Sequence, residues 1–148
     1  EQDYGLDPAI ATIAIAELDR LLTATDVLVL CCPLTPQTYH LLDRRRLAML
    51  PEHAVLVNIA RGDVVDEEAL TDSLVSRRIA GACLDVFSSE PLTEQSPLWQ
   101  LPNVIVSPHS ASTVDVENEL ITDLFCRNLE SWLAGRPLTN VFQAERGY

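Results

Sequence analysis

The sequence predicts an α/β fold, in which a parallel sheet is flanked by helices. Four short, continuously apolar runs recur along the chain, and amphipathic stretches with helical spacing separate them. Strands that are buried on both faces of a sheet are continuously apolar, whereas half-exposed strands alternate apolar and polar residues. The expected architecture is therefore a single α/β domain, whose parallel sheet of βαβ units is covered by helices on both faces.

The first half of the chain is expected to hold two helices and two strands. Leucines spaced three and four residues apart predict a helix over residues 16–22, and the first apolar run follows at 27–32. A short helix between residues 41 and 50 then leads to the second apolar run at 54–59. The two apolar runs and the helix between them form one βαβ unit.

The second half continues the alternation. A helix over residues 66–78 begins with three acids and ends with two arginines, as the helix dipole favours, and Gly81 is expected to close it. The third and fourth apolar runs are residues 82–87 and 104–106. These runs supply the remaining two strands.

A last helix is expected over residues 113–134, with Ser112 or Thr113 capping its start and Gly135 and Pro137 following its end. Its apolar side chains recur at helical spacing and are expected to be buried in core or interdomain packing. They are Leu120, Ile121, Leu124, Phe125, Leu129, Trp132 and Leu133.

Composition excludes several classes of function. The formal net charge is −12, from 22 acids and 10 bases, which argues against binding nucleic acid or an anionic membrane. No apolar run approaches the roughly 20 residues of a membrane span. The four cysteines form no CxxC pair and lie mainly in apolar stretches, which predicts buried free thiols and a cytoplasmic protein. With three scattered histidines, no metal site is predicted.

Chemically distinctive residues follow each apolar run. Cys32 and Pro33 end the first run, Arg61 follows the second, Asp85 lies in the third, and His109 follows the fourth. In an open parallel sheet, ligands bind beyond the carboxyl ends of the strands. These residues are therefore expected to gather along one edge of the sheet and to form a site.

Arg61, Glu90 and His109 suit the reduction of a 2-oxo acid. An arginine holds a substrate carboxylate in a bidentate fork and polarises the adjacent carbonyl. A histidine transfers a proton near neutral pH, and a neighbouring carboxylate orients the ring and favours its charged form. These residues supply the proton, and a cofactor would have to supply the hydride.

Three ordered motifs resemble signatures of the D-isomer-specific 2-hydroxyacid dehydrogenases. The segment 57–67 is similar to the second signature of that family, and 84–92 is similar to the third. The segment 101–109 is similar to the histidine segment, and Pro33-Leu34-Thr35-Pro36 with Thr38 also matches the family. Residues 107–112 and the closing 146–148 look most like the glyoxylate/hydroxypyruvate reductase branch.

The resemblance implies roles for particular residues. Arg61 would bind the substrate carboxylate, His109 would be the acid/base, Glu90 its partner, and Asp85 would bind the nicotinamide carboxamide. The cofactor would be NAD or NADP, the substrate a small 2-oxo or 2-hydroxy acid, and the full-length protein a homodimer. The residues expected to contact the cofactor are Cys32, Pro33, Thr38, Ile59, Ala60, Arg61, Asp85, His109 and Ala111.

The sequence departs from the family pattern in one respect. The phosphate-binding loop of the family needs clustered glycines, and the five glycines of this chain form no GxGxxG. We therefore expect residues 1–136 to be a partial dinucleotide-binding domain, with a partial Rossmann-like parallel sheet flanked by helices, in which the first βαβ elements of the family are missing. Residues 137–148 would be a tail returning to the substrate domain. The isolated chain is expected to be inactive.

Other interpretations remain open from the sequence. An arginine after a strand is usually a solvated charge, a lone histidine is often structural, and Asp85 at a strand end could cap backbone groups instead of binding a cofactor. A binding scaffold of the same fold, similar to the C-terminal-binding corepressors, is the alternative function. An inactive remnant is a third possibility.

Overall fold

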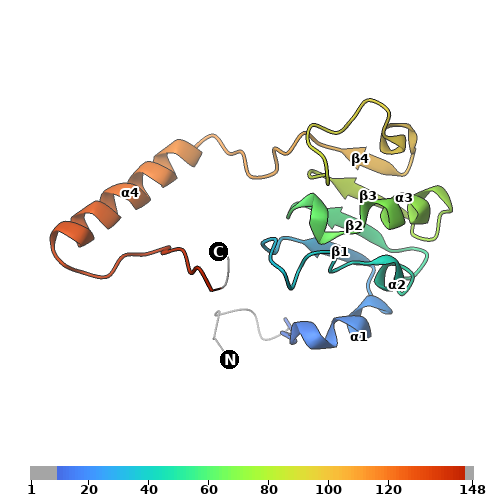
Figure 1. Cartoon of the computed structure of the whole chain (residues 1–148), viewed down its shortest axis with the longest axis horizontal. Helices are drawn as coiled ribbons and strands as arrows, with labels where there is room; N and C mark the ends of the chain where they lie inside the picture. Colours follow the sequence, from blue (N-terminus) through green and yellow to red (C-terminus); the bar gives the residue numbers. More distant parts are fainter. Residues whose placement is uncertain (1–9, 146–148) are drawn as a thin grey trace.

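The fold is a four-stranded parallel sheet, seen in a computed structural model that describes residues 10–145 (Figure 1). The strands are β1 (Val27–Leu30), β2 (Val55–Asn58), β3 (Gly81–Leu84) and β4 (Val104–Val106), and they pair in the order in which they occur in the chain. All three pairings are parallel, so the carboxyl ends of the strands share one edge. The predicted α/β class and parallel sheet are confirmed.

Helices connect the strands. The regular α-helices are α1 (Leu18–Leu22), α2 (Arg44–Leu47), α3 (Glu67–Val75) and α4 (Glu117–Leu133), and the 3₁₀ turns are η1 (Ile15–Glu17), η2 (Gly62–Val64) and η3 (Pro97–Gln100). The helix predicted over 41–50 is therefore one turn long. Asp66 caps α3 because its side chain accepts a hydrogen bond of 3.0 Å from the amide of Ala69.

The core lies on one face of the sheet, where α1, α2 and α3 pack against it. Their fully buried leucines belong to one cluster with the inward-facing residues of the strands (Leu22, Leu30, Leu47, Leu56, Leu70, Leu74 and Leu84). Successive residues of a strand point to opposite faces, so the row Val29, Val57, Cys83 and Ile105 faces the other way. Val29 is 51% exposed and Ile105 is 66% exposed.

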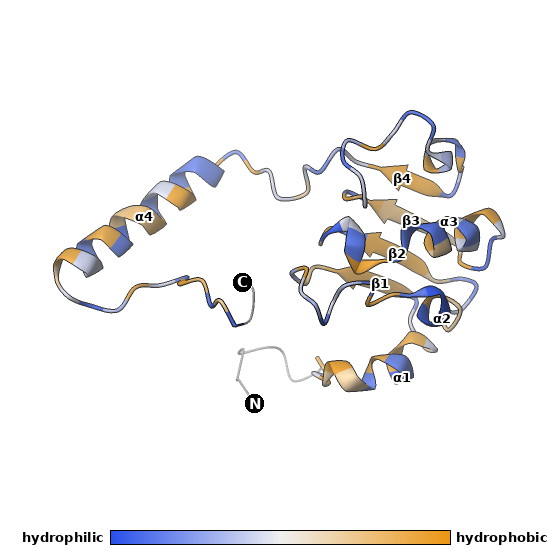
Figure 2. Ribbon diagram, in the orientation of Figure 1, coloured by the Kyte–Doolittle hydropathy of each residue, from blue (hydrophilic) through white to orange (hydrophobic). Residues whose placement is uncertain are grey.

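The expectation that helices cover both faces is therefore wrong for the described residues. Hydropathy colouring shows that the strands are mainly apolar (Figure 2), although Val29 and Ile105 on one face of the sheet are exposed. Continuous apolar runs indicate that both faces avoid water, but they do not identify what covers each one.

The end of α3 also differs from the prediction. Gly81 does not close the helix, because it is the first residue of β3, where a Cβ atom would lie 2.5 Å from the carbonyl oxygen of Asn103. The helix ends at Val75 with Ser76 as its C-cap, and Arg77 takes the left-handed conformation with φ of 54°. The amide of Arg77 donates to Leu74 and that of Arg78 donates to Ser73, which is the Schellman pattern.

Helix α4 projects away from the sheet on an extended connection (Figure 1). None of its residues is buried, and its apolar side chains include Trp132 at 67% exposure, so the predicted burial of this stripe is wrong here. Neither Ser112 nor Thr113 caps it, since it begins after Val116 with no side-chain cap. Gly135 ends the helix as predicted, with φ of 66°. No helix among the described residues is long and apolar enough to span a bilayer.

Two smaller features complete the fold. The tail after α4 runs back beside it, because the side chain of Asn128 bonds both the amide and the carbonyl of Thr139. The four cysteines are free thiols as expected, but none is buried: Cys31 and Cys126 are exposed, and Cys32 and Cys83 are half-buried. Cys83 lies in the row that faces the uncovered side of the sheet, so an apolar run does not by itself bury a thiol.

Candidate active site

Arg61 lies in a loop whose backbone is held by the side chain of a buried asparagine. Asn58 ends β2 and is 2% exposed. Its side-chain oxygen accepts from the amide of Ala60 at 3.1 Å, and its side-chain nitrogen donates to the carbonyl of Arg61 at 3.1 Å. These two bonds fix the turn from which the exposed Arg61 side chain extends. The guanidinium itself donates to the carbonyl of Ala60 at 2.6 Å.

Gly62 allows this loop to touch the loop that follows β3. A Cβ atom at Gly62 would lie 1.9 Å from the carbonyl carbon of Phe87 and 2.3 Å from the amide nitrogen of Ser88, so only glycine fits. Glu67, in the first turn of α3, strengthens the contact by accepting a 2.8 Å hydrogen bond from the amide of Ser88. The loops carrying Arg61 and Glu90 are thus held together through their backbones.

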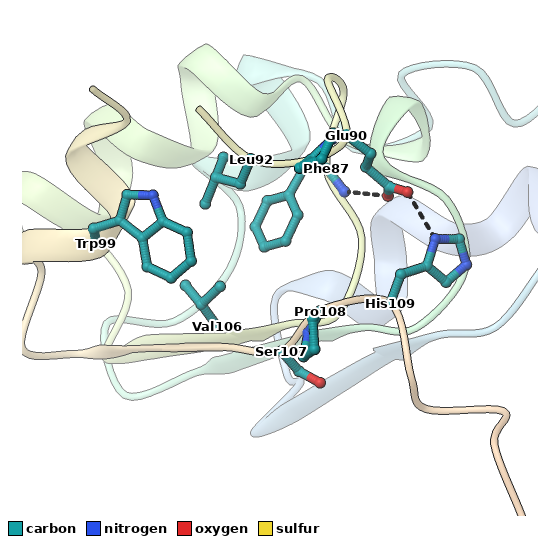
Figure 3. A pocket seen from close by; sticks show the side chains of 9 residues that line it. Phe87, Glu90, Leu92, Trp99, Val106, Ser107, Pro108 and His109 are labelled. Carbon is teal, nitrogen blue, oxygen red and sulfur yellow. Dashed lines mark hydrogen bonds and ion pairs between the residues drawn. The ribbon is translucent and has the colours of Figure 1, made fainter. Parts of the chain in front are cut away.

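Glu90 and His109 form a direct pair (Figure 3). The His109 Nδ1 atom lies 2.7 Å from Glu90 Oε2, and Glu90 Oε1 accepts from the amide of Phe87 at 2.9 Å. The hydrogen bond from His109 and then that from Phe87 lower the pKa of Glu90, with nearby Arg61 contributing by charge. The carboxylate is therefore ionised near neutral pH. Because an ionised carboxylate only accepts, Nδ1 carries the proton and Nε2 is left for a ligand.

Asp85 holds the loop that carries His109. The side chain is 5% exposed, and its two oxygens accept hydrogen bonds of 2.9 Å from the amides of Ser110 and Ala111. Burial works against the charge, but the hydrogen bonds from Ser107, Ser110 and Ala111 outweigh it and lower the pKa of the Asp85 carboxyl. Asp85 therefore contacts backbone in this structure, which is the capping arrangement that the sequence left open.

Most of the residues predicted to contact a cofactor line a single hollow of about 550 Å³ beyond the ends of β1 and β2. Its lining includes Cys32, Pro33, Ile59, Ala60 and Arg61. Thr38 lies apart from it: its buried hydroxyl donates to the carbonyl of Pro33 at 2.7 Å and so shapes the loop from within. The amide of Ala111 donates a hydrogen bond to the carboxylate of Asp85.

A second hollow of about 710 Å³ adjoins the Glu90–His109 pair. Figure 3 shows Phe87, Leu92, Trp99 and Val106 around it, with Glu90 and His109 at one side. The pair is only partly shielded from water, since 43% of the His109 side chain and 35% of the Glu90 side chain are exposed. The described residues therefore leave one side of the pair open.

Sequence reasoning missed the residues that shape the loops. Asn58 was assigned no role, although a polar residue in an otherwise apolar run is a signal that its side chain caps nearby backbone groups. The contact made by Gly62 had no local signal, because Phe87 and Ser88 are distant in the sequence. Residues 146–148, which carried part of the resemblance to the reductase branch, lie outside the described residues.

The arrangement can bind an anion and move a proton. Arg61 offers an exposed guanidinium, a group that recognises carboxylates. His109 presents Nε2 while Glu90 holds the other ring nitrogen, and this geometry suits a general acid that can be recharged from solvent. No group of three or more potential metal ligands occurs in the described part of the chain.

Comparison with known proteins identifies a family that this chain resembles. Residues 5–111 match the profile described as D-isomer specific 2-hydroxyacid dehydrogenase, NAD binding domain. The chain is 40% identical over 135 residues to a glyoxylate reductase of Thermofilum pendens, which covers 91% of this chain and 40% of that protein. It is 52% identical over 96 residues to glyoxylate/hydroxypyruvate reductase B of Pectobacterium carotovorum, covering 65% of this chain and 30% of that protein. The chain thus spans less than half the length of these relatives.

Comparison with solved structures points to the same family. A D-isomer specific 2-hydroxyacid dehydrogenase from Xanthobacter autotrophicus, in complex with NADPH, superposes with a TM-score of 0.84 at 42% identity, covering 90% of this chain and 54% of that one. An NADPH-dependent glyoxylate/hydroxypyruvate reductase from Sinorhizobium meliloti, in complex with NADP, gives a TM-score of 0.87 at 33% identity. That match covers 97% of this chain and 46% of the other.

Proposed function

Because the chain belongs to the D-isomer specific 2-hydroxyacid dehydrogenase family, we propose that it serves in an NAD(P)-dependent oxidoreductase. The reaction is the interconversion of small 2-oxo acids and D-2-hydroxy acids, with glyoxylate and hydroxypyruvate as the preferred substrate class. Relatives named as reductases of these two acids support that choice. The catalytic residues proposed are Arg61, Glu90 and His109.

The observation that carries the proposal is the 2.7 Å bond between His109 Nδ1 and Glu90 Oε2. It fixes the ring so that Nε2 is the atom that gives a proton to the carbonyl oxygen in reduction and takes it back in oxidation. Arg61 binds the substrate carboxylate and polarises the carbonyl beside it. The alternative of a binding scaffold requires no oriented imidazole, so the pair favours the enzyme.

The dinucleotide, when bound, supplies or accepts the hydride. The hollow lined by Cys32, Pro33, Ile59, Ala60 and Arg61 fits one wall of such a site, because it lies at the carboxyl edge of the sheet, where α/β folds bind ligands. The 148 residues contain no GxGxxG to receive the pyrophosphate. We infer that the chain by itself does not hold the cofactor and is inactive.

The test is a chimera that joins this chain to the upstream part of the Thermofilum pendens glyoxylate reductase. NADH and NADPH oxidation with glyoxylate or hydroxypyruvate is expected from the chimera and not from the 148-residue chain. The substitution His109→Asn should lower kcat by about 10²–10⁴-fold. The control His53→Asn replaces an exposed histidine that bonds Asp26, outside the site, and should leave kcat unchanged.

One result would overturn the role of His109, and another would overturn the inference that the chain alone is inactive. Equal turnover in the chimera and its His109→Asn variant would remove His109 from the mechanism. Measurable turnover by the 148-residue chain alone would show that it needs no added phosphate-binding loop.

The proposal extends to the setting of the protein. Four free thiols support a reducing compartment, and the cytoplasm is the setting we propose. The exposed apolar face of α4 supports a homodimer of the full-length protein, since large exposed apolar patches mark interfaces.

A further inference from the structure

The loop that carries His109 has an unusual backbone. His109 has φ of 54°, in the left-handed region that residues other than glycine seldom adopt. The loop follows β4, and the next residues, Ser110 and Ala111, are exposed. Such a conformation persists only where surrounding contacts determine it.

Asp85 supplies the contact that determines it. The side chain follows β3, is 5% exposed, and directs both carboxylate oxygens at the amides of Ser110 and Ala111. Two charge-assisted bonds to consecutive amides fix the direction in which the chain leaves His109. Glu90 can then accept from Nδ1 of the imidazole.

We propose that Asp85 is a positioning residue for His109, acting through the backbone of Ser110 and Ala111. The role rests on the proposed function of His109 but needs no cofactor, so it is separate from the contact with a nicotinamide that the family resemblance implies. An ionised carboxylate has about four lone-pair sites, and the two amides and the Ser107 hydroxyl occupy three of them. The same carboxylate could therefore hold the loop and accept a further bond.

The experiment uses the 148-residue chain with no dinucleotide and no 2-oxo acid, and it reads the pKa of Glu90 by ¹³C NMR titration. The variant is Asp85→Asn, which keeps the shape but turns one acceptor into a donor that faces an amide. Asp123→Asn, on α4, is the charge-matched control.

The direction of the change distinguishes positioning from simple charge. The groups that lower the pKa of Glu90 are His109, the amide of Phe87 and Arg61. If Asp85 positions His109, Asp85→Asn weakens the His109–Glu90 bond, and the pKa of Glu90 rises toward its ordinary value. Loss of a nearby negative charge alone would lower that pKa. An unchanged or lowered pKa of Glu90 would overturn the proposal.

A second measurement needs no variant. In the unsubstituted chain, the amides of Ser110 and Ala111 should exchange with deuterium at least about tenfold more slowly than in an unfolded chain, because Asp85 accepts from both. Both residues are exposed, and each amide donates to Asp85, so slow exchange would report on these two hydrogen bonds. Exchange of both amides at unfolded rates would contradict the clamp even if Asp85→Asn did not fold. Neither readout involves turnover, so failure here is distinct from failure of the proposed function.

Discussion

Single residues decide the geometry of the site mainly through backbone contacts. Asn58 shapes the Arg61 turn, and Asp85 bonds the loop after His109. A left-handed backbone at a residue other than glycine costs about 1–2 kcal/mol. The charged bonds to Ser110 and Ala111 offset that cost at His109. The side chains proposed to meet substrate are thus supported by buried polar groups whose partners are main-chain atoms.

Gly62 gives the sharpest prediction at this scale. Gly62→Ala should destabilise the chain by about 3 kcal/mol or more, because the added methyl meets backbone at 1.9 Å and no rotamer change relieves the clash. Urea unfolding measures this loss. The control Gly135→Ala meets no atom within 4 Å and bears only the strain of its φ of 66°, so it should cost about 1–2 kcal/mol. Equal losses in the two variants would contradict the close contact.

At the scale of elements, α3 and α4 end in the same way with different residues. Both close with the Schellman pattern, in which the left-handed position is Arg77 after α3 and Gly135 after α4. Glycine takes that conformation without a steric penalty, whereas arginine does not. The end of α3 is therefore less stable than its hydrogen bonds alone would make it.

Glycine at position 77 should make the chain more stable than alanine there. Arg77 is exposed, so its side chain contributes little packing. Arg77→Gly is expected to raise the free energy of unfolding by about 0.5–1 kcal/mol relative to Arg77→Ala, since alanine keeps the Cβ atom that strains the turn. Thermal unfolding of the two variants compares them directly. A glycine variant no more stable than the alanine variant would show that the turn is unstrained.

At the scale of the whole molecule, two apolar surfaces have no cover among the described residues. One is the sheet face that carries Val29 and Ile105, and the other is the stripe along α4 that includes Phe125 and Trp132. The helices on the opposite face complete a core without either surface. The stability of the sheet unit should therefore not depend on α4.

Truncation tests this independence. Removing residues 117–148 should change the free energy of unfolding of the sheet unit by less than about 0.5 kcal/mol, because α4 buries none of its residues. As a positive control, Leu56→Ala in the full chain should cost about 2–5 kcal/mol, since Leu56 is fully buried. A loss of more than about 1 kcal/mol on truncation would show that α4 supports the core.

Much of the site could be predicted because its signals are local. An apolar run followed by a charged residue places that residue at the carboxyl edge of a parallel sheet, which located Arg61 and His109. The structure confirms the class of the sheet and pairs Glu90 with His109. The roles of these residues in catalysis stay predictions. Local patterns do not encode two sets of contacts. One is the hydrogen bond from the Thr38 hydroxyl to the carbonyl of Pro33, and the other is the pair of bonds from Ser110 and Ala111 to Asp85.

The sequence by itself determined the strands, the start of α3 at Asp66 and the order of the reactive residues, because periodicity and capping depend on neighbours in the chain. Only the tertiary structure decided what each apolar face meets. Helical spacing indicates that the apolar stripe of α4 avoids water. Burial also needs a second surface that packs against the stripe, and the local pattern does not specify that surface. The same reason explains Gly62 and Gly81: both are required by backbone more than 20 residues away.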